Sequence, residues 1–131
     1  MSRNILGIAA LVFALALAWS TNATAENELL PAELAGKFTT ASGVSWVLAA
    51  GDQGAVEGFF SGKDRFGQVT GQYERGAVHA YWFDDSATPV CSAERDGTRN
   101  WGRITFTVEP SGLRGFIGEC DDVPTLPWSA R

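Results

Sequence analysis

The feature that most restricts the fold of this 131-residue chain is a five-residue pattern that occurs four times: a branched aliphatic residue, a spacer, glycine or alanine, a spacer and a large apolar residue. The copies span 56–60, 69–73, 78–82 and 113–117. Side chains alternate between the two faces of a β-strand, so each copy places its aliphatic, small and large residues on one face. The small residue has two interpretations. It marks a bend where a sheet curls into a barrel, or it leaves empty volume inside that barrel.

Turn residues divide the chain after residue 33 into eight short segments with this alternation. Turn signals such as Gly-Asp-Gln-Gly at 51–54 separate the segments, and no window there has a convincing helical period. Short connections favour pairing of neighbouring strands, and an up-and-down sheet loses its edges only when its first and last strands meet. We therefore predict an all-β fold, an eight-stranded antiparallel up-and-down β-barrel. Its predicted strands are 34–40, 44–50, 55–61, 67–74, 77–84, 101–109, 113–120 and 126–131.

Residues 1–25 have the features of a secretory signal peptide. Arg3 precedes an apolar run at 5–18, and Ala-Thr-Ala at 23–25 is a small-residue cleavage site. The run is too short for a convincing membrane span. We expect a secreted or periplasmic protein with an N-terminal lead at 26–33 and a single barrel domain at 34–131.

The charge of the exported chain excludes one class of partner. Without Arg3, nine basic and fifteen acidic residues remain, a formal net charge of −6. Such a surface repels phosphate groups, so neither nucleic acid nor an anionic membrane is expected as a partner.

Cys91 and Cys120 are the only cysteines. In an oxidising compartment a disulfide between them is the expected state. It would pin the one long irregular segment, 85–100, to the seventh strand. A loop of this length in a compact domain is usually functional or mobile.

The alternation also separates the two faces of the sheet. The opposite face carries polar residues such as Glu57, Thr70 and Arg114, but it also carries large aromatic residues. These aromatics indicate a partner surface, for example in a homo-oligomer; alternatively, they are scattered and the long loop folds over them. The aromatic residues are Phe59, Tyr81, Phe83 and Phe116, and the predicted inner row is Val56, Gly58, Phe60, Val69, Gly71, Tyr73, Val78, Ala80, Trp82, Ile104, Phe106, Val108, Leu113, Gly115 and Ile117.

No pattern of catalytic or metal-binding residues is present. His79 is the only histidine and falls on the polar face, so a zinc site is not expected. Acidic residues at 84–85 and 119–122 could gather calcium, but their spacing matches no loop motif, and solvated turn acids are the simpler interpretation. Nucleophile elbows and phosphate-binding glycine loops are also missing from the sequence. We therefore expect no enzyme activity, no cofactor and no metal.

The segment 34–61, LAGKFTTASGVSWVLAAGDQGAVEGFFS, has its glycines at 36, 43, 51, 54 and 58. In this spacing it resembles the first three strands of the avidin and streptavidin family. The segment 69–73 (VTGQY) resembles that family's Leu-Thr-Gly-spacer-Tyr strand. The resemblance implies an avidin-like barrel that binds a small molecule at one open end and assembles into oligomers.

The same resemblance argues against tight binding of biotin. In avidins an Asn, a Ser and a Tyr hold the ureido oxygen, and the matching positions here are Thr40, Val44 and Phe60. Two of these side chains cannot donate a hydrogen bond. Ser42 and Ser45 could replace the missing donors.

Aromatic walls around a few polar groups are typical of small-ligand sites. We predict that Thr40, Ser42 and Ser45 supply polar contacts and that Phe60, Tyr73, Trp82 and Trp101 form the walls; core packing is the alternative role for these aromatics. The function we expect is non-covalent binding of a small, possibly biotin-like, molecule. The alternative is a protein–protein interaction module, such as an inhibitor or adhesion component, with a filled barrel.

Overall fold

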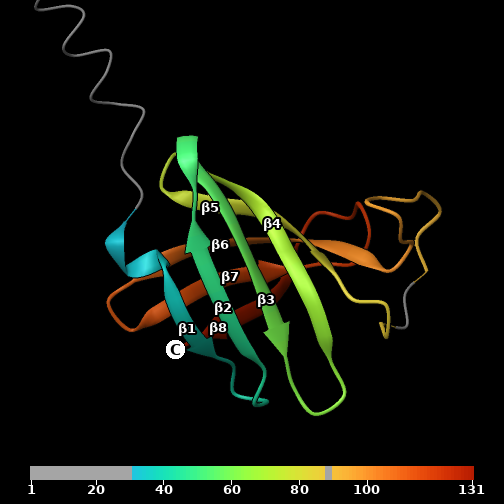
Figure 1. Ribbon diagram of the computed structural model, residues 1–131, viewed down its shortest axis with the longest axis horizontal. Coiled ribbons are helices and arrows are strands. Elements are labelled where there is room, and N and C mark those ends of the chain that lie inside the picture. Colours follow the sequence, from blue (N-terminus) through green and yellow to red (C-terminus); the bar gives the residue numbers. More distant parts are fainter. Residues whose placement is uncertain (1–30, 88–89) are drawn as a thin grey trace, which may run out of the picture.

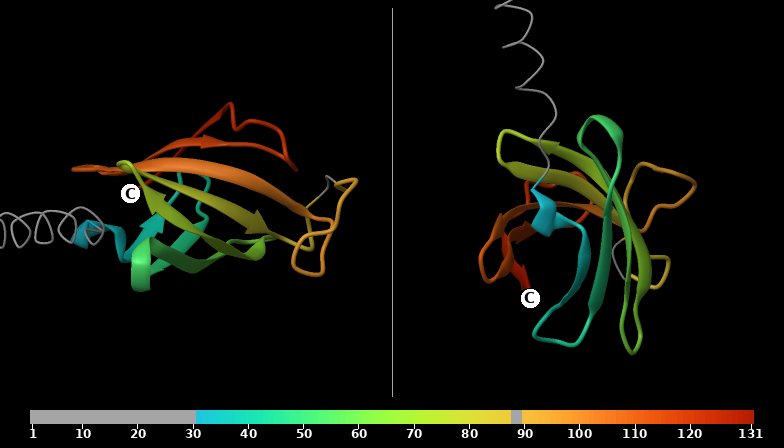
Figure 2. Two further views of the ribbon diagram at one scale, coloured as in Figure 1. Left: turned by 90° about the horizontal axis from the view of Figure 1, so that it is seen from above. Right: turned by 60° about the vertical axis from the view of Figure 1, so that its left-hand side comes forward.

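The computed structural model describes residues 31–87 and 90–131. The predicted signal segment 1–25 and residues 26–30 of the lead lie outside the described residues. Eight antiparallel strands follow one another in sequence order within one sheet (Figure 1), and the sheet curls into a nearly closed barrel (Figure 2). This confirms the predicted fold class. The strands are β1 (Gly36–Thr39), β2 (Ser45–Ala50), β3 (Ala55–Ser61), β4 (Phe66–Glu74), β5 (Ala77–Phe83), β6 (Trp101–Glu109), β7 (Gly112–Ile117) and β8 (Leu126–Ala130).

Two strands, β1 and β7, are shorter than the sequence predicts by more than one residue. β1 begins at Gly36 because Ala32–Leu34 forms a 3-10 turn, η1, whose Leu34 side chain is fully buried in the core. β7 ends at Ile117, and Cys120 soon afterwards adopts a φ of 53°, which turns the chain away from strand geometry. A second 3-10 turn, η2 (Asp52–Gly54), connects β2 to β3.

The central glycines of the repeated pattern allow the strands to approach closely. A Cβ atom on Gly58, Gly71 or Gly115 would lie 2.1, 2.3 or 1.9 Å from a backbone oxygen of a neighbouring strand. Real Cβ atoms do not come this close, so any side chain would push the paired strands apart. Of the two sequence interpretations, the structure favours curvature of the sheet over empty volume.

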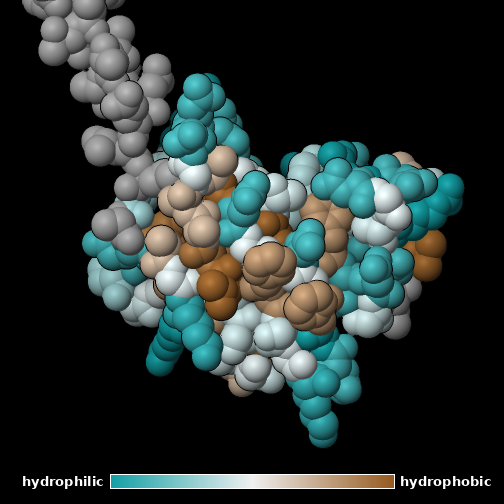
Figure 3. Space-filling view, in the orientation of Figure 1, coloured by the Kyte–Doolittle hydropathy of each residue, from teal (hydrophilic) through white to brown (hydrophobic). Residues whose placement is uncertain are grey.

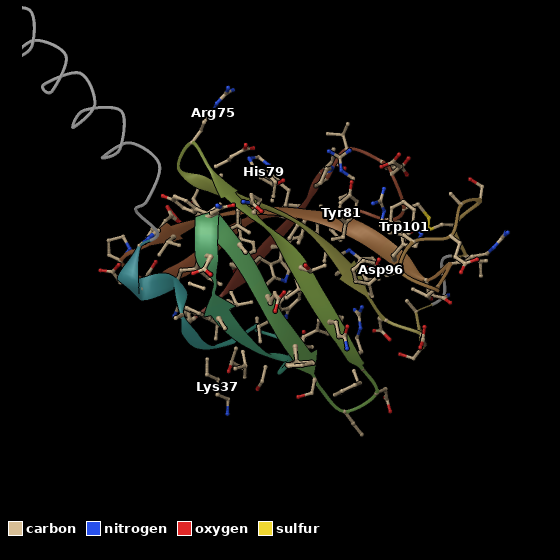
Figure 4. All side chains as sticks on the ribbon, turned by 45° about the horizontal axis from the view of Figure 1, so that its top comes forward. Lys37, Arg75, His79, Tyr81, Asp96 and Trp101 are labelled. Carbon is tan, nitrogen blue, oxygen red and sulfur yellow. A yellow bond between two sulfur atoms is a disulfide. The ribbon has the colours of Figure 1, made fainter. Side chains whose placement is uncertain are left out.

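The core lies inside the barrel. Every residue of the predicted inner row is buried or half-buried, which confirms the alternation. In contrast, His79 on β5 is exposed, as predicted (Figure 4).

The barrel closes through a narrow seam between its first and last strands. In the described chain, β1 and β8 share no ladder, but Thr39 and Arg131 exchange two backbone hydrogen bonds of 2.7 and 2.9 Å. Successive residues of a strand direct their backbone groups to opposite sides, so Pro127, four residues before Arg131, faces the seam as Arg131 does. Because proline has no N–H to donate, this edge position costs no ladder hydrogen bond.

An up-and-down order places alternate connections at the same end of the barrel. The segments 40–44, 62–65, 84–87, 90–100 and 118–125 gather at one end, which we call the loop end. η1 and the shorter connections lie at the other end (Figure 2).

Candidate functional site

Aromatic side chains fill the middle of the barrel. The ring of Trp46 on β2 stacks on Phe60 of β3 with 4.7 Å between centroids, and Trp46 and Trp128 on β8 meet edge to face with 4.9 Å between centroids. Trp128 also contacts Phe106 of β6 at 5.5 Å. Rings from β2, β3, β6 and β8 therefore meet across the interior.

A pocket with a volume of about 550 Å³ lies at the loop end. Its apolar lining includes Trp82 at the end of β5, Ile117 at the end of β7 and Leu126 at the start of β8. The Trp82 Nε1–H donates to the Gly118 carbonyl at 3.0 Å, which fixes the ring beneath the β7–β8 connection. The other lining residues are Asp64, Arg65, Ser86, Ala87, Gly118, Glu119, Asp122, Val123 and Thr125.

Arg65 and Asp84 form an ion pair beside this pocket. The Arg65 Nε–H donates to Asp84 Oδ2 at 3.0 Å, and the guanidinium lies over the rings of Phe60 and Trp82 at 5.7 and 6.0 Å from their centroids. Asp84 is only 1% exposed and also accepts hydrogen bonds from the backbone and hydroxyl of Ser86. This network joins the β3–β4 turn to the start of the long loop.

The environment of Asp84 predicts a dependence of stability on pH. Burial raises the pKa of this carboxyl, but the hydrogen bonds from Ser86 and Arg65 outweigh burial and hold the pKa below its usual value. A group with a lowered folded-state pKa stabilises the fold above its unfolded-state pKa of about 4, and this contribution is lost as the pH falls through the folded-state value. We expect Asp84→Asn to lower the melting temperature at pH about 7, and the difference from the wild type to shrink below pH about 4. An equal difference at all pH values in thermal melts would contradict this role.

The long loop folds over the outer face of the barrel and is not a free lid. The guanidinium carbon of Arg95 lies 3.9 Å from the ring centroid of Tyr81 and 5.0 Å from that of Trp101. The Trp101 Nε1–H donates to the Ala93 carbonyl at 3.0 Å. Figure 4 shows Tyr81, Trp101 and the tip of the loop at Asp96 close together. The predicted disulfide between Cys91 and Cys120, which the structure contains, ties this loop to the β7–β8 connection.

The three predicted polar contacts do not line the pocket. The hydroxyl of Thr40 accepts a hydrogen bond from the Val44 backbone N–H at 3.0 Å and lies 3.0 Å from the Ser42 hydroxyl. These groups therefore stabilise their own turn. Ser45 pairs with Thr39 on the outer face, one residue out of phase with the inward Trp46.

Of the four predicted aromatic walls, the structure places only Trp82 in the pocket. Phe60 is buried beneath Arg65, and Tyr73 pairs with Val78 toward the opposite end of the barrel. Trp101 lies on the outer face beneath the long loop. On β6, Gly102 and Ile104 lie on the inner face. Trp101 is one residue before Gly102, so the alternation of the strand already places its side chain outside the barrel.

Sequence reasoning missed the charged residues of the pocket. Arg65 lies in a turn whose ion partner is 19 residues away, and nothing local predicts that contact. As acids near a strand end, Glu119 and Asp122 suggest solvated turn residues or calcium ligands, and their spacing does not predict a place in this pocket. Within 31–87 and 90–131, no three residues of the types that bind metals converge on one point.

The outer aromatic residues differ in their exposure to solvent. Tyr81 and Phe83 are half-buried, whereas Phe59 and Phe116 are 53% and 48% exposed. Phe59 pairs with Val47, which is 50% exposed, and Phe66 on β4 is 67% exposed. Figure 3 shows apolar side chains gathered on this face over β2, β3 and β4.

Comparisons with known proteins add no identification. A scan against protein-family models, a search of curated proteins and a search of solved structures each found no match. Among the described residues, no helix is long and apolar enough to span a membrane.

Proposed function

We propose that this protein binds a small molecule without covalent chemistry in the pocket at the loop end of the barrel. The observation that carries the proposal is the pocket of about 550 Å³ beside Trp82, with Ile117 and Leu126 next to it and polar groups around them. Concave sites with apolar walls and a few polar groups are the usual form of small-ligand sites. The aromatic rings that meet in the middle of the barrel favour this end as the place for the ligand.

Biotin is not the ligand we propose. At the three positions that match the avidin donors, Thr40 bonds within its own turn, Val44 has an aliphatic side chain, and Phe60 is buried under Arg65. A buried ureido group without donors would lose roughly 1–3 kcal/mol for each missing hydrogen bond.

Trp82 provides the test of this proposal. We expect phenethyl alcohol, a small neutral aromatic probe, to shift the NMR signal of the Trp82 indole N–H in a saturable manner, because this ring lines the pocket. The signal of Trp46, in the filled middle of the barrel, should stay in place as an internal control. Trp82→Phe assigns the signal. If neither this probe nor its amine and carboxylate analogues shift it, the pocket does not bind small molecules of this size.

The alternative function, a protein–protein interaction module, is favoured by the apolar side chains of Val47, Phe59 and Phe66 on the outer face. Exposed apolar patches often mark interaction sites. If the partner is a second copy of this chain, light scattering tests the interaction role. An oligomer of the wild type that dissociates in the Phe59→Glu variant would support that role, whereas a wild-type monomer would count against self-association.

A further inference from the structure

We propose that the ligand of this pocket is an organic cation, a molecule with an apolar body and a protonated amine or quaternary ammonium group. This inference rests on the proposed function and adds the chemical class of the ligand. It follows from the excess of negative charge on the pocket wall and from the exposed apolar side chains on the same wall.

The pocket wall carries uncompensated negative charge. Among the described lining residues Arg65 is the only cation, and it pairs with the buried Asp84. Three lining carboxylates, those of Asp64, Glu119 and Asp122, have no ion partner in the described chain. An anion that approached Arg65 would meet these three carboxylates as well, whereas a cation would be attracted by them.

The positions of the three acids favour an extended cation over a metal ion. Asp64 comes from the β3–β4 turn, whereas Glu119 and Asp122 come from the β7–β8 connection. Within the part of the chain that the structure describes, they do not converge into a set of metal ligands. A charge carried on an organic molecule can lie among separated carboxylates without direct coordination by all of them.

The same wall exposes apolar surface that a ligand would cover. Val123 is 72% exposed and Leu126 is 66% exposed, and both line the pocket next to Trp82. Arg65 already lies over the Phe60 and Trp82 rings. The apolar body of the ligand therefore packs against Leu126 and Val123 beside Trp82, and its charged group lies at the acidic rim.

Three probes of similar size separate charge from shape: phenethylamine, phenethyl alcohol and phenylacetate. The Trp82 indole signal reports the binding of each probe. We expect the amine to bind most tightly, the alcohol more weakly and the carboxylate most weakly. Exposed ion pairs change a binding constant by up to about fivefold each. Glu119→Gln combined with Asp122→Asn should therefore weaken the amine by about three- to tenfold and weaken the alcohol less than the amine.

A matched control removes acids of the same type away from the pocket. Glu57→Gln and Glu74→Gln, on the polar outer faces of β3 and β4, should leave the affinity for the amine within about twofold, because salt screens exposed charges beyond roughly 10 Å. Higher ionic strength should weaken the amine and not the alcohol. Equal binding of amine and alcohol, or tighter binding of phenylacetate, overturns the cation inference while the pocket proposal stands. If no probe binds, both proposals fail.

Discussion

Phe60→Ala is expected to lower the free energy of unfolding by about 3–5 kcal/mol, the range for large aromatic residues truncated in a core. Phe60 is 2% exposed, stacks on Trp46 and lies under the Arg65 guanidinium. Its removal would leave a cavity in the middle of the barrel and take away the surface on which Arg65 rests. Urea unfolding followed by tryptophan fluorescence measures the change.

The neighbouring residue provides a matched control for this prediction. Phe59 lies on the same strand but points outward and is 53% exposed. Phe59→Ala should change the free energy of unfolding by no more than about 0.5 kcal/mol, as surface substitutions usually do. Equal losses for the two variants would mean that the assignment of inner and outer faces is wrong.

Removal of the disulfide by Cys91→Ala together with Cys120→Ala is expected to cost about 3–4 kcal/mol. The bond joins residues 29 apart in the sequence, and without it the unfolded chain regains the entropy of this loop. The β7–β8 connection forms one wall of the pocket, so the variant should also bind the neutral probe more weakly. Denaturant unfolding and the Trp82 signal measure the two effects.

Two controls identify the source of that loss. Full reduction of the wild type should lower its free energy of unfolding to that of the double variant. The same reductant should not change the free energy of unfolding of the double variant. A loss below about 1 kcal/mol would mean that the remaining contacts of the loop, such as the hydrogen bond from Trp101 to Ala93, hold it without the disulfide.

The sequence predicted the strands well because the information for them is local. An alternation with a period of two needs only neighbouring residues, and the glycine-rich turns limit where each strand ends. The inner row from Val56 to Ile117 is confirmed for this reason. The disulfide could also be predicted from the sequence, because only two cysteines are present.

The candidate site was much less predictable. Trp101 could have been assigned correctly, because its position three residues before the inward Ile104 places its side chain outside the barrel, whereas we predicted it as a wall of the ligand site beside Trp82. The avidin resemblance itself stays a prediction. Arg65, Asp84 and Glu119 had no such signal, because loop residues follow no period and their contacts join distant segments.

The sequence alone thus determined the number of strands, their order and the face on which each side chain lies, because these follow from alternation and short turns. Only the tertiary structure decided which loop residues meet at the loop end. The up-and-down order places the β3–β4 turn, the long loop and the β7–β8 connection at the loop end, and the curvature of the sheet, which close approach at Gly71 and Gly115 permits, brings them together across the barrel. Contacts among these segments depend on the whole barrel, and so the ion pair of Arg65 with Asp84 and the acidic rim around Trp82 appear only in the folded chain.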